Sequence, residues 1–107
     1  MKRTATTETN ALTRSIIRYI EALGGMAWRN NTGTRGGIRY GKKGSGDVFA
    51  LYKGRFYSVE LKTGRDTLSE DQARWIAEVR QQGGTAVVAY SIDDVIKAIP
   101  SIRESEK

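Results

Sequence analysis

Two strand-like segments joined by a two-residue turn place the strongest constraint on what this chain folds into. Residues 47–52 and 55–62 are rich in valine, phenylalanine, tyrosine and leucine, which is typical of β-strands. The Lys53–Gly54 pair between them predicts a tight hairpin turn, although Asn or Asp before the glycine would be a stronger signal. When the hairpin register is continued outward from this turn, it predicts that Asp47 lies directly opposite Glu60.

The segments around this hairpin complete an α/β pattern. Apolar residues recur at the spacing of one helix face from Leu12 to Leu23, and the glycines that follow predict the end of that helix. Ser69 begins a capping-box sequence, which predicts a second helix. The remaining predicted elements are a short strand over residues 26–30, a central buried strand over residues 85–90 and a last short helix that Pro100 stops. The predicted fold is a single α/β domain over residues 1–107, a central mixed four-stranded sheet flanked by helices in the order α-β-β-β-α-β-α.

A glycine-rich basic segment precedes Asp47. Residues 33–46 hold six of the twelve glycines of the chain, so this segment is predicted to be a mobile loop or an irregular ribbon. The run from Arg29 to Lys43 contains several cations and no acid, and the whole chain carries a net charge of +6. This balance favours nucleic acid as a partner, although charge alone fits a merely soluble basic protein equally well. The residues predicted to contact DNA phosphates are Arg35, Arg39, Lys42 and Lys43, with Tyr40 predicted to stack on a base or sugar.

The residue types that are missing exclude several classes of chemistry. The chain has no cysteine and no histidine, which excludes disulfides, thiolate metal sites, histidine general bases and serine–histidine triads. No stretch approaches the roughly 18 consecutive apolar residues of a membrane span, and the polar start lacks the apolar core of a signal peptide. We therefore expect a cytoplasmic protein, bacterial or phage-encoded, whose chemistry depends on carboxylates, lysines, hydroxyls or amides.

Asp47, Glu60 and Lys62 form a candidate site for phosphodiester hydrolysis. Directly opposed residues of a hairpin have Cβ atoms about 4.5–5.5 Å apart, so the two carboxylates repel each other unless a cation lies between them. A divalent metal such as Mg2+ prefers oxygen ligands. Lys62 follows Glu60 by two residues and therefore emerges on the same strand face, beside the predicted metal. The alternative is that Glu60 and Lys62 are an ordinary solvated pair, but this alternative leaves Asp47 uncompensated.

The order and spacing of these motifs resemble those of a known nuclease family. The residues that carry this resemblance are Gly44-Ser45-Gly46-Asp47, then Glu60-Leu61-Lys62, then Gln72 on the following helix. Together they resemble the PD-(D/E)xK nuclease superfamily, and nearly the whole chain is similar to a stand-alone domain of the VRR-NUC family. The resemblance implies a restriction-endonuclease-like core and DNA cleavage that depends on Mg2+, for which Mn2+ substitutes. It also implies a homodimer similar to Holliday-junction resolvases, selective for four-way junctions or other branched DNA, with no small-molecule cofactor.

The same resemblance implies roles for particular residues. The implied metal ligands are Asp47, Glu60 and the backbone carbonyl of Leu61, and the other implied active-site residues are Lys62, Gln72 and Glu8. Glu8 matches the acid on the family's first helix better than Glu21 does, by its distance from the turn at Gly24. Each of the last two roles has a simpler alternative, because Glu8 also suits a helix N-terminus and Gln72 also suits a capping box. Cap and active-site roles do not exclude each other at Gln72.

Two departures from the family pattern and two alternative functions remain open. Gly46 stands where many superfamily members have proline, and Thr13 stands where the family often has glutamine. Trp28 and Trp75 are predicted to lie in the core or an interface rather than to stack on bases.

The first alternative function is a non-catalytic nucleic-acid-binding module on the same fold. The second is a nuclease subunit that requires a partner for activity.

Overall fold

The sheet at the centre of the fold has four strands. The computed structural model describes residues 2–99, with side chains described from Thr9 onward. The strands are β1 (Met26–Arg29), β4 (Val48–Tyr52), β5 (Arg55–Leu61) and β6 (Thr85–Ala89), in the spatial order β1-β4-β5-β6. β1 and β5 are antiparallel to β4, whereas β6 is parallel to β5. The predicted mixed four-stranded sheet is therefore confirmed.

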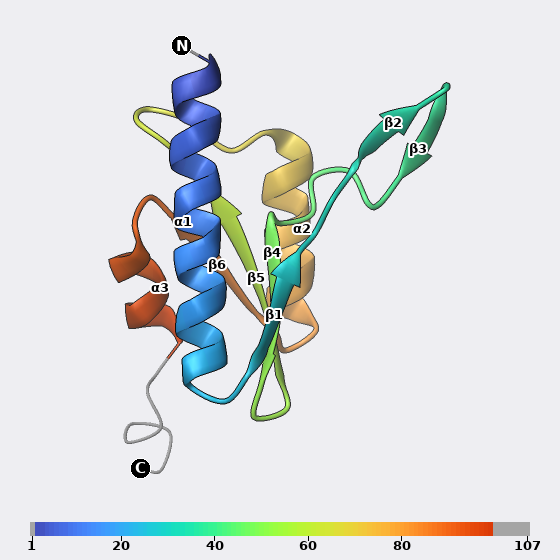
Figure 1. The fold of residues 1–107 in the computed structure, drawn as a ribbon. Coiled ribbons are helices and arrows are strands. Elements are labelled where there is room, and N and C mark those ends of the chain that lie inside the picture. Colours follow the sequence, from blue (N-terminus) through green and yellow to red (C-terminus); the bar gives the residue numbers. More distant parts are fainter. Residues whose placement is uncertain (1, 100–107) are drawn as a thin grey trace.

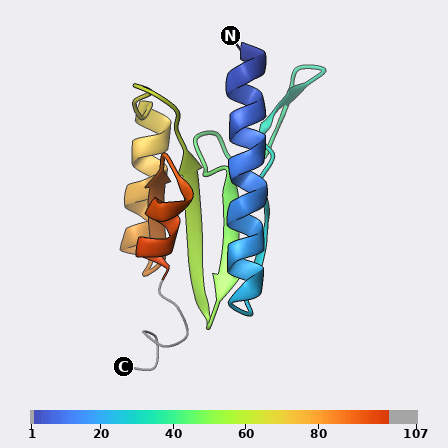
Figure 2. The same cartoon turned by 60° about the vertical axis from the view of Figure 1, so that its left-hand side comes forward.

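Helices cover both faces of this sheet (Figure 1). α1 (Lys2–Ala22) and α3 (Ile92–Ala98) contact each other and lie on one face, while α2 (Glu70–Gln81) lies on the other, as Figure 2 shows. α1 begins earlier than the periodicity predicted, and its apolar stripe still faces the sheet through Ile16 and Ile20. No helix within residues 2–99 is long and apolar enough to cross a membrane.

Alternation along the strands directs side chains into two cores. On β4, Val48 and Ala50 are fully buried against the α1 side, whereas Phe49 stacks on Trp75 of α2 with ring centroids 5.7 Å apart. The larger core, under α1 and α3, comprises Ile16, Ile20, Val48, Ala50, Tyr52, Tyr57, Val59, Leu61, Val87, Ala89, Val95 and Ile99. The smaller core, under α2, comprises Ile76, Val79 and Ala86, with Phe56, Trp75 and Val88 packed against it.

The predicted hairpin register is confirmed along β4 and β5. Lys53 and Gly54 both have positive φ angles, 51° and 79°, as a two-residue hairpin turn requires. Tyr52 faces Arg55, and the ladder continues in this register to the last pair of β4 and β5. The predicted pairing of Asp47 directly opposite Glu60 is wrong, because the ladder ends at the pair of Val48 and Val59. The backbone N–H of Asp47 instead donates a 2.8 Å hydrogen bond to the carbonyl of Val59.

Two sequence-based expectations about the strands were wrong. The basic segment that was expected to be a mobile loop or an irregular ribbon contains a second hairpin, made of β2 (Gly33–Arg35) and β3 (Ile38–Tyr40). This hairpin projects away from the body of the protein (Figure 1). β6, expected to be central, is an edge strand. Its apolar sequence is explained by the contacts of α2 and α3 with it, and Pro100, which was expected to stop the last helix, lies outside the described residues.

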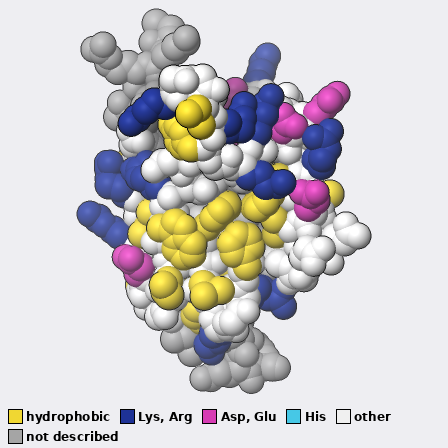
Figure 3. All heavy atoms as spheres, turned by 90° about the vertical axis from the view of Figure 1, so that its right-hand side faces the viewer, with side chains coloured by type: hydrophobic (Ala, Val, Ile, Leu, Met, Phe, Trp, Pro, Cys, Tyr) yellow, Lys and Arg dark blue, Asp and Glu magenta, His cyan; other side chains and the backbone are white. Residues whose placement is uncertain are grey.

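One half of the α2 face of the sheet is left open. α2 packs mainly on β6, so the half formed by β1 and β4 carries exposed apolar side chains. Met26, Trp28 and Leu51 are 60%, 43% and 41% exposed, and the strand register places Met26 beside Leu51 and Trp28 beside Phe49. Figure 3 shows a broad hydrophobic area on this side of the molecule, with lysines and arginines gathered above it. We call this area, defined by Met26, Trp28, Phe49 and Leu51, the open apolar face.

Candidate active site

The two carboxylates predicted to hold a metal lie together at the carboxyl end of β5. Glu60 is the second-last residue of β5 and is only 5% exposed. Asp47 directly precedes β4, and its Oδ2 accepts a 2.8 Å hydrogen bond from the backbone N–H of Leu61. The two carboxyl groups are close enough for a hydrogen bond between them when Glu60 is protonated. The hairpin register therefore brings the two acids together even though Asp47 lies outside the ladder.

The pKa of Glu60 is raised from its ordinary 4.5 to about 8. Burial of the carboxyl group is the largest cause, because it disfavours the charged form. The negative charge of Asp47 and the hydrogen bond between the two carboxyl groups raise this pKa further, and the positive charge of Lys62 lowers it. Without another cation, Glu60 therefore keeps its proton at neutral pH. A divalent cation would stabilise the ionised carboxylate in place of that proton.

Gln72 connects Glu60 to Lys62. The Gln72 Nε2 group donates to Glu60 Oε2 at 2.8 Å, and Lys62 Nζ donates to Gln72 Oε1 at 2.8 Å. Gln72 Oε1 also accepts a 2.9 Å bond from the backbone N–H of Ser69. Because two donors face the amide oxygen, the amide nitrogen must face Glu60. Gln72 thus closes the capping box and contacts both candidate catalytic residues at the same time.

Helix α2 is anchored so that Gln72 faces the carboxylates. The N-cap is Ser69, whose Oγ accepts a 3.1 Å bond from the backbone N–H of Gln72. One turn further along, Trp75 Nε1 donates a 2.8 Å bond to Ser58 Oγ on β5. Ser58 and Glu60 are two residues apart on the strand, so they share the face that α2 covers. These bonds fix both the start of α2 and its approach to β5.

Gly46 allows the chain that carries Asp47 to lie close against β5. A Cβ at this position would clash with Ser58 Oγ and would lie 2.9 Å from the carbonyl oxygen of Val59. The same carbonyl accepts the N–H of Asp47. Proline also carries a Cβ, so the packing of this chain against Ser58 and Val59 favours glycine at this position.

The donor set fits a hard divalent cation. Within residues 9–99, no cluster of three or more histidine, cysteine, aspartate or glutamate side chains could hold a metal. The two side-chain donors are Asp47 and Glu60, and the backbone carbonyl of Leu61 is the third ligand that the resemblance implies. Mg2+ is commonly held by one or two carboxylates and keeps several waters. A pair of close carboxylates, one of them ionised only when a cation compensates it, meets that requirement.

The first helix carries the remaining candidates for the site. Glu8 lies on α1, but its side chain is outside the described side chains. The Asn10 side chain, one half-turn further on, accepts a 3.3 Å bond from Arg29 at the end of β1, so this part of α1 lies near the end of the sheet where Asp47 enters. Glu21 lies at the opposite end, since its carbonyl accepts the N–H of Gly24 in the turn to β1. Thr13 is buried, and its hydroxyl donates to the carbonyl of Thr9 within the helix.

The predicted DNA-binding residues lie on the projecting hairpin and on the chain that returns from it. Arg35 is on β2, Arg39 and Tyr40 are on β3, and all three are exposed. Lys42 and Lys43 follow β3, and Lys43 Nζ lies 3.3 Å from Asp71 Oδ2 in the first turn of α2. Lys43 therefore joins the returning chain to the helix that carries Gln72, while the hairpin cations are free of the sheet. The hairpin leaves the sheet at the same end as the carboxylates (Figure 1).

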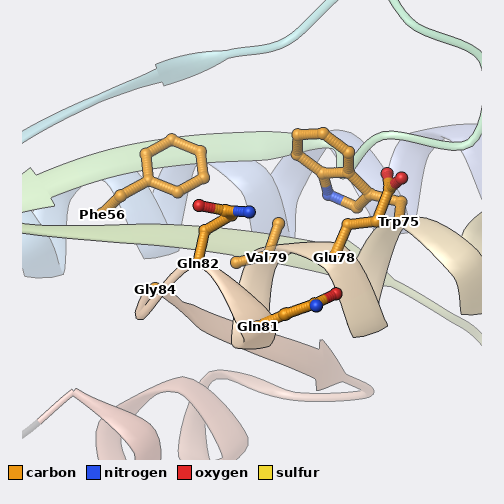
Figure 4. A pocket seen from close by; sticks show the side chains of 7 residues that line it. All are labelled: Phe56, Trp75, Glu78, Val79, Gln81, Gln82 and Gly84. Atoms are coloured by element: carbon orange, nitrogen blue, oxygen red, sulfur yellow. The ribbon is translucent and has the colours of Figure 1, made fainter.

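A separate hollow lies further along α2. Figure 4 shows it between Phe56 and the carboxyl-terminal half of α2, with Trp75, Val79 and Gln82 around it. It encloses about 420 Å³, and Glu78 is its single acid. Neither Asp47 nor Glu60 lines it. Its chemistry is apolar and amide in character, so it does not compete with the carboxylate pair as a metal site.

Sequence reasoning missed the residues that support the site from outside. The sequence patterns include Asn30 only as the end of a predicted strand and Ser45 only in the motif before Asp47, and no pattern singles out Ser58. Asn30 bonds to Ser45 and Gly46, and Ser58 accepts the bond from Trp75. The sequence signal that could have identified Asn30 is its position: an amide side chain with two N–H donors lies directly after a predicted strand and before the long basic segment. Trp75 packs against the smaller core as predicted, whereas Trp28 is exposed in the open apolar face and is not a core residue.

Comparison with known families gives a direct match. A family model described as the VRR-NUC domain matches residues 9–93, which include most of α1 and the start of α3. Asp47, Glu60, Lys62 and Gln72 all lie within the matched range. No curated protein matches the sequence. The family match confirms the resemblance that the sequence motifs indicated.

Proposed function

Because the chain belongs to the VRR-NUC family of nuclease domains, we propose that it is a metal-dependent DNA endonuclease that acts through Asp47, Glu60 and Lys62. The observation that carries the proposal is the buried Glu60 carboxyl, held beside Asp47 and linked through Gln72 to Lys62. A buried acid beside a second, partly buried acid and a lysine is costly for stability unless the three groups serve a bound cation and a charged substrate.

We propose Mg2+ as the resident cation, with Mn2+ as a substitute. Asp47, Glu60 and the carbonyl of Leu61 would hold it. When bound there, such a cation supplies positive charge at the scissile phosphate and makes a water molecule more acidic. The all-oxygen donor set supports this choice over zinc, which prefers nitrogen and sulfur ligands.

The protein's own residues then orient and stabilise the reacting groups. The Lys62 ammonium group lies beside the carboxylates, where it stabilises the negative charge that builds on the phosphate oxygens. Gln72 fixes the direction of Lys62 by accepting one of its protons, which leaves the other two for substrate or water. The Leu61 N–H bond to Asp47 keeps that carboxylate turned toward Glu60. No histidine is required for these roles.

The hairpin formed by β2 and β3 is proposed to hold the DNA backbone. Its cations, Arg35 and Arg39, are exposed and form no ion pair with any residue that the structure describes, which supports phosphate contacts. The predicted test is the double variant Arg35→Ala and Arg39→Ala, assayed for junction-DNA binding in EDTA. We expect the slope of log affinity against log salt to become shallower by about 2, because each lost phosphate contact removes about 0.9.

The control for this prediction is Lys97→Ala, which removes an exposed cation from α3 on the other side of the sheet. The same salt slope in the hairpin variant and in the wild type would show that phosphates bind elsewhere. An equal change in the control would show a general effect of net charge.

We propose further that the protein acts as a homodimer on branched DNA. Both properties come from the family resemblance, and the open apolar face supports the dimer, because monomers rarely expose an apolar area of this kind. A second copy packed on Met26, Trp28 and Leu51 would remove it from water. Two active sites in one symmetric particle would suit a four-way junction, which has paired strands to cut.

The dimer is tested by the double variant Met26→Lys and Leu51→Lys in sedimentation velocity. We expect the wild type to be a dimer at micromolar concentration and this variant to be a monomer, because the charges would be buried without partners. Ile96→Lys is the matched control, since Ile96 is also 42% exposed but lies on α3 on the opposite face. A monomeric wild type, or a variant that stays dimeric, would contradict the proposed interface.

An alternative function is a non-catalytic nucleic-acid-binding module. The basic hairpin alone would suffice for it, and it predicts salt-sensitive binding without cleavage under any divalent ion. The nuclease is favoured because Gln72 links Glu60 to Lys62 by hydrogen bonds and Asp47 lies beside Glu60.

A further inference from the structure

We propose that Asn30 is a positioning residue that fixes Asp47 for metal binding. The proposal rests on the proposed function, because it assumes that Asp47 is a metal ligand. Asn30 directly follows β1, at the point where the chain leaves the sheet for the β2–β3 hairpin. Gly46 and Asp47 lie where the chain returns to the sheet. The two ends of this excursion therefore meet at Asn30.

Asn30 binds the returning chain through three hydrogen bonds. Its Nδ2 group donates to Ser45 Oγ at 2.7 Å and to the carbonyl of Gly46 at 2.8 Å. Its backbone N–H donates to the carbonyl of Asp47 at 2.9 Å. The side chain thus donates both of its amide protons to the two residues that directly precede Asp47.

The segment that Asn30 binds is a closed turn with little room to move. The N–H and Oγ of Ser45 both donate to the carbonyl of Lys42, at 3.1 and 2.6 Å. Gly44 packs so tightly on α2 that a Cβ there would lie 2.6 Å from the backbone of Asp71. The turn is therefore held by α2 on one side and by Asn30 of β1 on the other.

This placement determines where the Asp47 carboxylate can reach. Its Oδ2 has to meet the N–H of Leu61 while the carboxyl group stays beside Glu60. If Asn30 loses its amide group, the carbonyl of buried Gly46 loses its side-chain donor. The chain would then shift toward water, and Asp47, the next residue, would shift with it.

The test is Asn30→Ala, measured by calorimetric titration with Mn2+ alone and by steady-state cleavage of junction DNA. We expect the Mn2+ affinity or kcat to fall by about 10–100-fold, the usual effect of removing a group that orients a metal ligand. KM for DNA should stay unchanged, because the hairpin keeps its cations. Asn30→Asp keeps the size of the side chain but cannot donate, and it should not restore kcat.

Two further variants keep the result interpretable. Asn31→Ala changes the exposed neighbouring residue and should match the wild type in Mn2+ affinity and kcat. Ser45→Ala removes one of the two acceptors of Asn30 and should cause a smaller loss than Asn30→Ala. If Asn30→Ala fails to fold, the Ser45→Ala variant tests the proposal in its place. An unchanged Mn2+ affinity and kcat in folded Ser45→Ala would then overturn the proposal.

The outcomes separate this inference from the proposed function. If the wild type binds Mn2+ and cleaves DNA, and folded Asn30→Ala does both equally well, Asn30 is not a positioning residue while the nuclease proposal stands. If the wild type binds no Mn2+, the metal site itself is wrong and both proposals fail. A higher KM for DNA with unchanged kcat and Mn2+ affinity would assign Asn30 to the hairpin and overturn its role at Asp47.

Discussion

Glu60→Gln is expected to lower the rate of DNA cleavage in Mg2+ by at least about 1000-fold, the largest effect of any single change. The loss of one carboxylate removes half of the side-chain charge that would hold the cation, and several kcal/mol of charge stabilisation correspond to a factor of this size. Glutamine keeps the size of glutamate and can still accept the bond from Gln72 Nε2. Single-turnover cleavage of labelled DNA measures the effect.

The same variant should be more stable than the wild type when metal is absent. The pKa of Glu60 is about 8 in the folded protein against an ordinary 4.5, so the folded state keeps a proton that the unfolded chain gives up between these values. Raising the pH through this window therefore destabilises the wild type in EDTA, by on the order of 5 kcal/mol when ionisation is complete. Glu60→Gln should not lose stability in this pH window, because it has no carboxyl group at position 60. Mg2+ should restore the stability that the wild type loses.

Thermal denaturation in EDTA between about pH 5 and pH 9 checks this linkage. Glu78→Gln is the matched control, since Glu78 is an exposed acid on α2 away from the carboxylate pair. It should follow the wild type in both cleavage and stability. An inactive Glu60→Gln that is also less stable than the wild type at high pH would indicate a folding defect rather than a lost ligand.

Lys62→Met is expected to lower kcat by about 100–1000-fold while Mn2+ affinity changes little. The lysine contributes a fixed positive charge at the position where negative charge develops, and removal of one such group costs about 3–4 kcal/mol in other enzymes. Methionine keeps the length of the apolar stem, so the packing beside Gln72 is preserved. The measurements are single-turnover cleavage and calorimetric titration with Mn2+.

Lys97→Met is the control for a lost surface cation, because Lys97 is exposed on α3. It should cleave like the wild type. If Lys62→Met cleaves at the wild-type rate, Lys62 is an ordinary strand residue and the assigned chemistry is wrong. If it loses Mn2+ affinity together with activity, its role is to organise the carboxylates rather than to stabilise the reacting phosphate.

The sheet and the carboxylate pair could be predicted because they depend on local, periodic signals. Alternating apolar residues and the Lys53–Gly54 turn set the register, and this register brings Asp47 to the end of β5 that carries Glu60. The bonds of Asp47 to Val59 and Leu61 then hold it beside Glu60. Gln72 could be placed because a capping box ties its position to Ser69. These signals act over a few residues, and the fold does not override them.

Prediction from the sequence failed where the structure depends on tertiary contacts. The hairpin of β2 and β3 lacks apolar alternation and pairs without contacting a core, so its composition resembled that of a loop. β6 was expected to be central because apolar strands are usually buried between other strands. Here α2 and α3 bury this edge strand instead. Asn30 lies fifteen residues from its partner Ser45, and no local pattern reports a bond of that separation.

The most direct test of the account is a gel cleavage assay with four-way junction, single-stranded and duplex DNA, each in Mg2+, Mn2+ or EDTA, beside Lys62→Met. We expect cuts that require Mg2+ or Mn2+, favour the junction and are almost lost in the variant. Cuts on all substrates would keep the nuclease and remove the junction preference. Binding that weakens with salt but no cleavage by the wild type under either metal would contradict the central claim, and it would favour a binding module or a subunit that requires a partner.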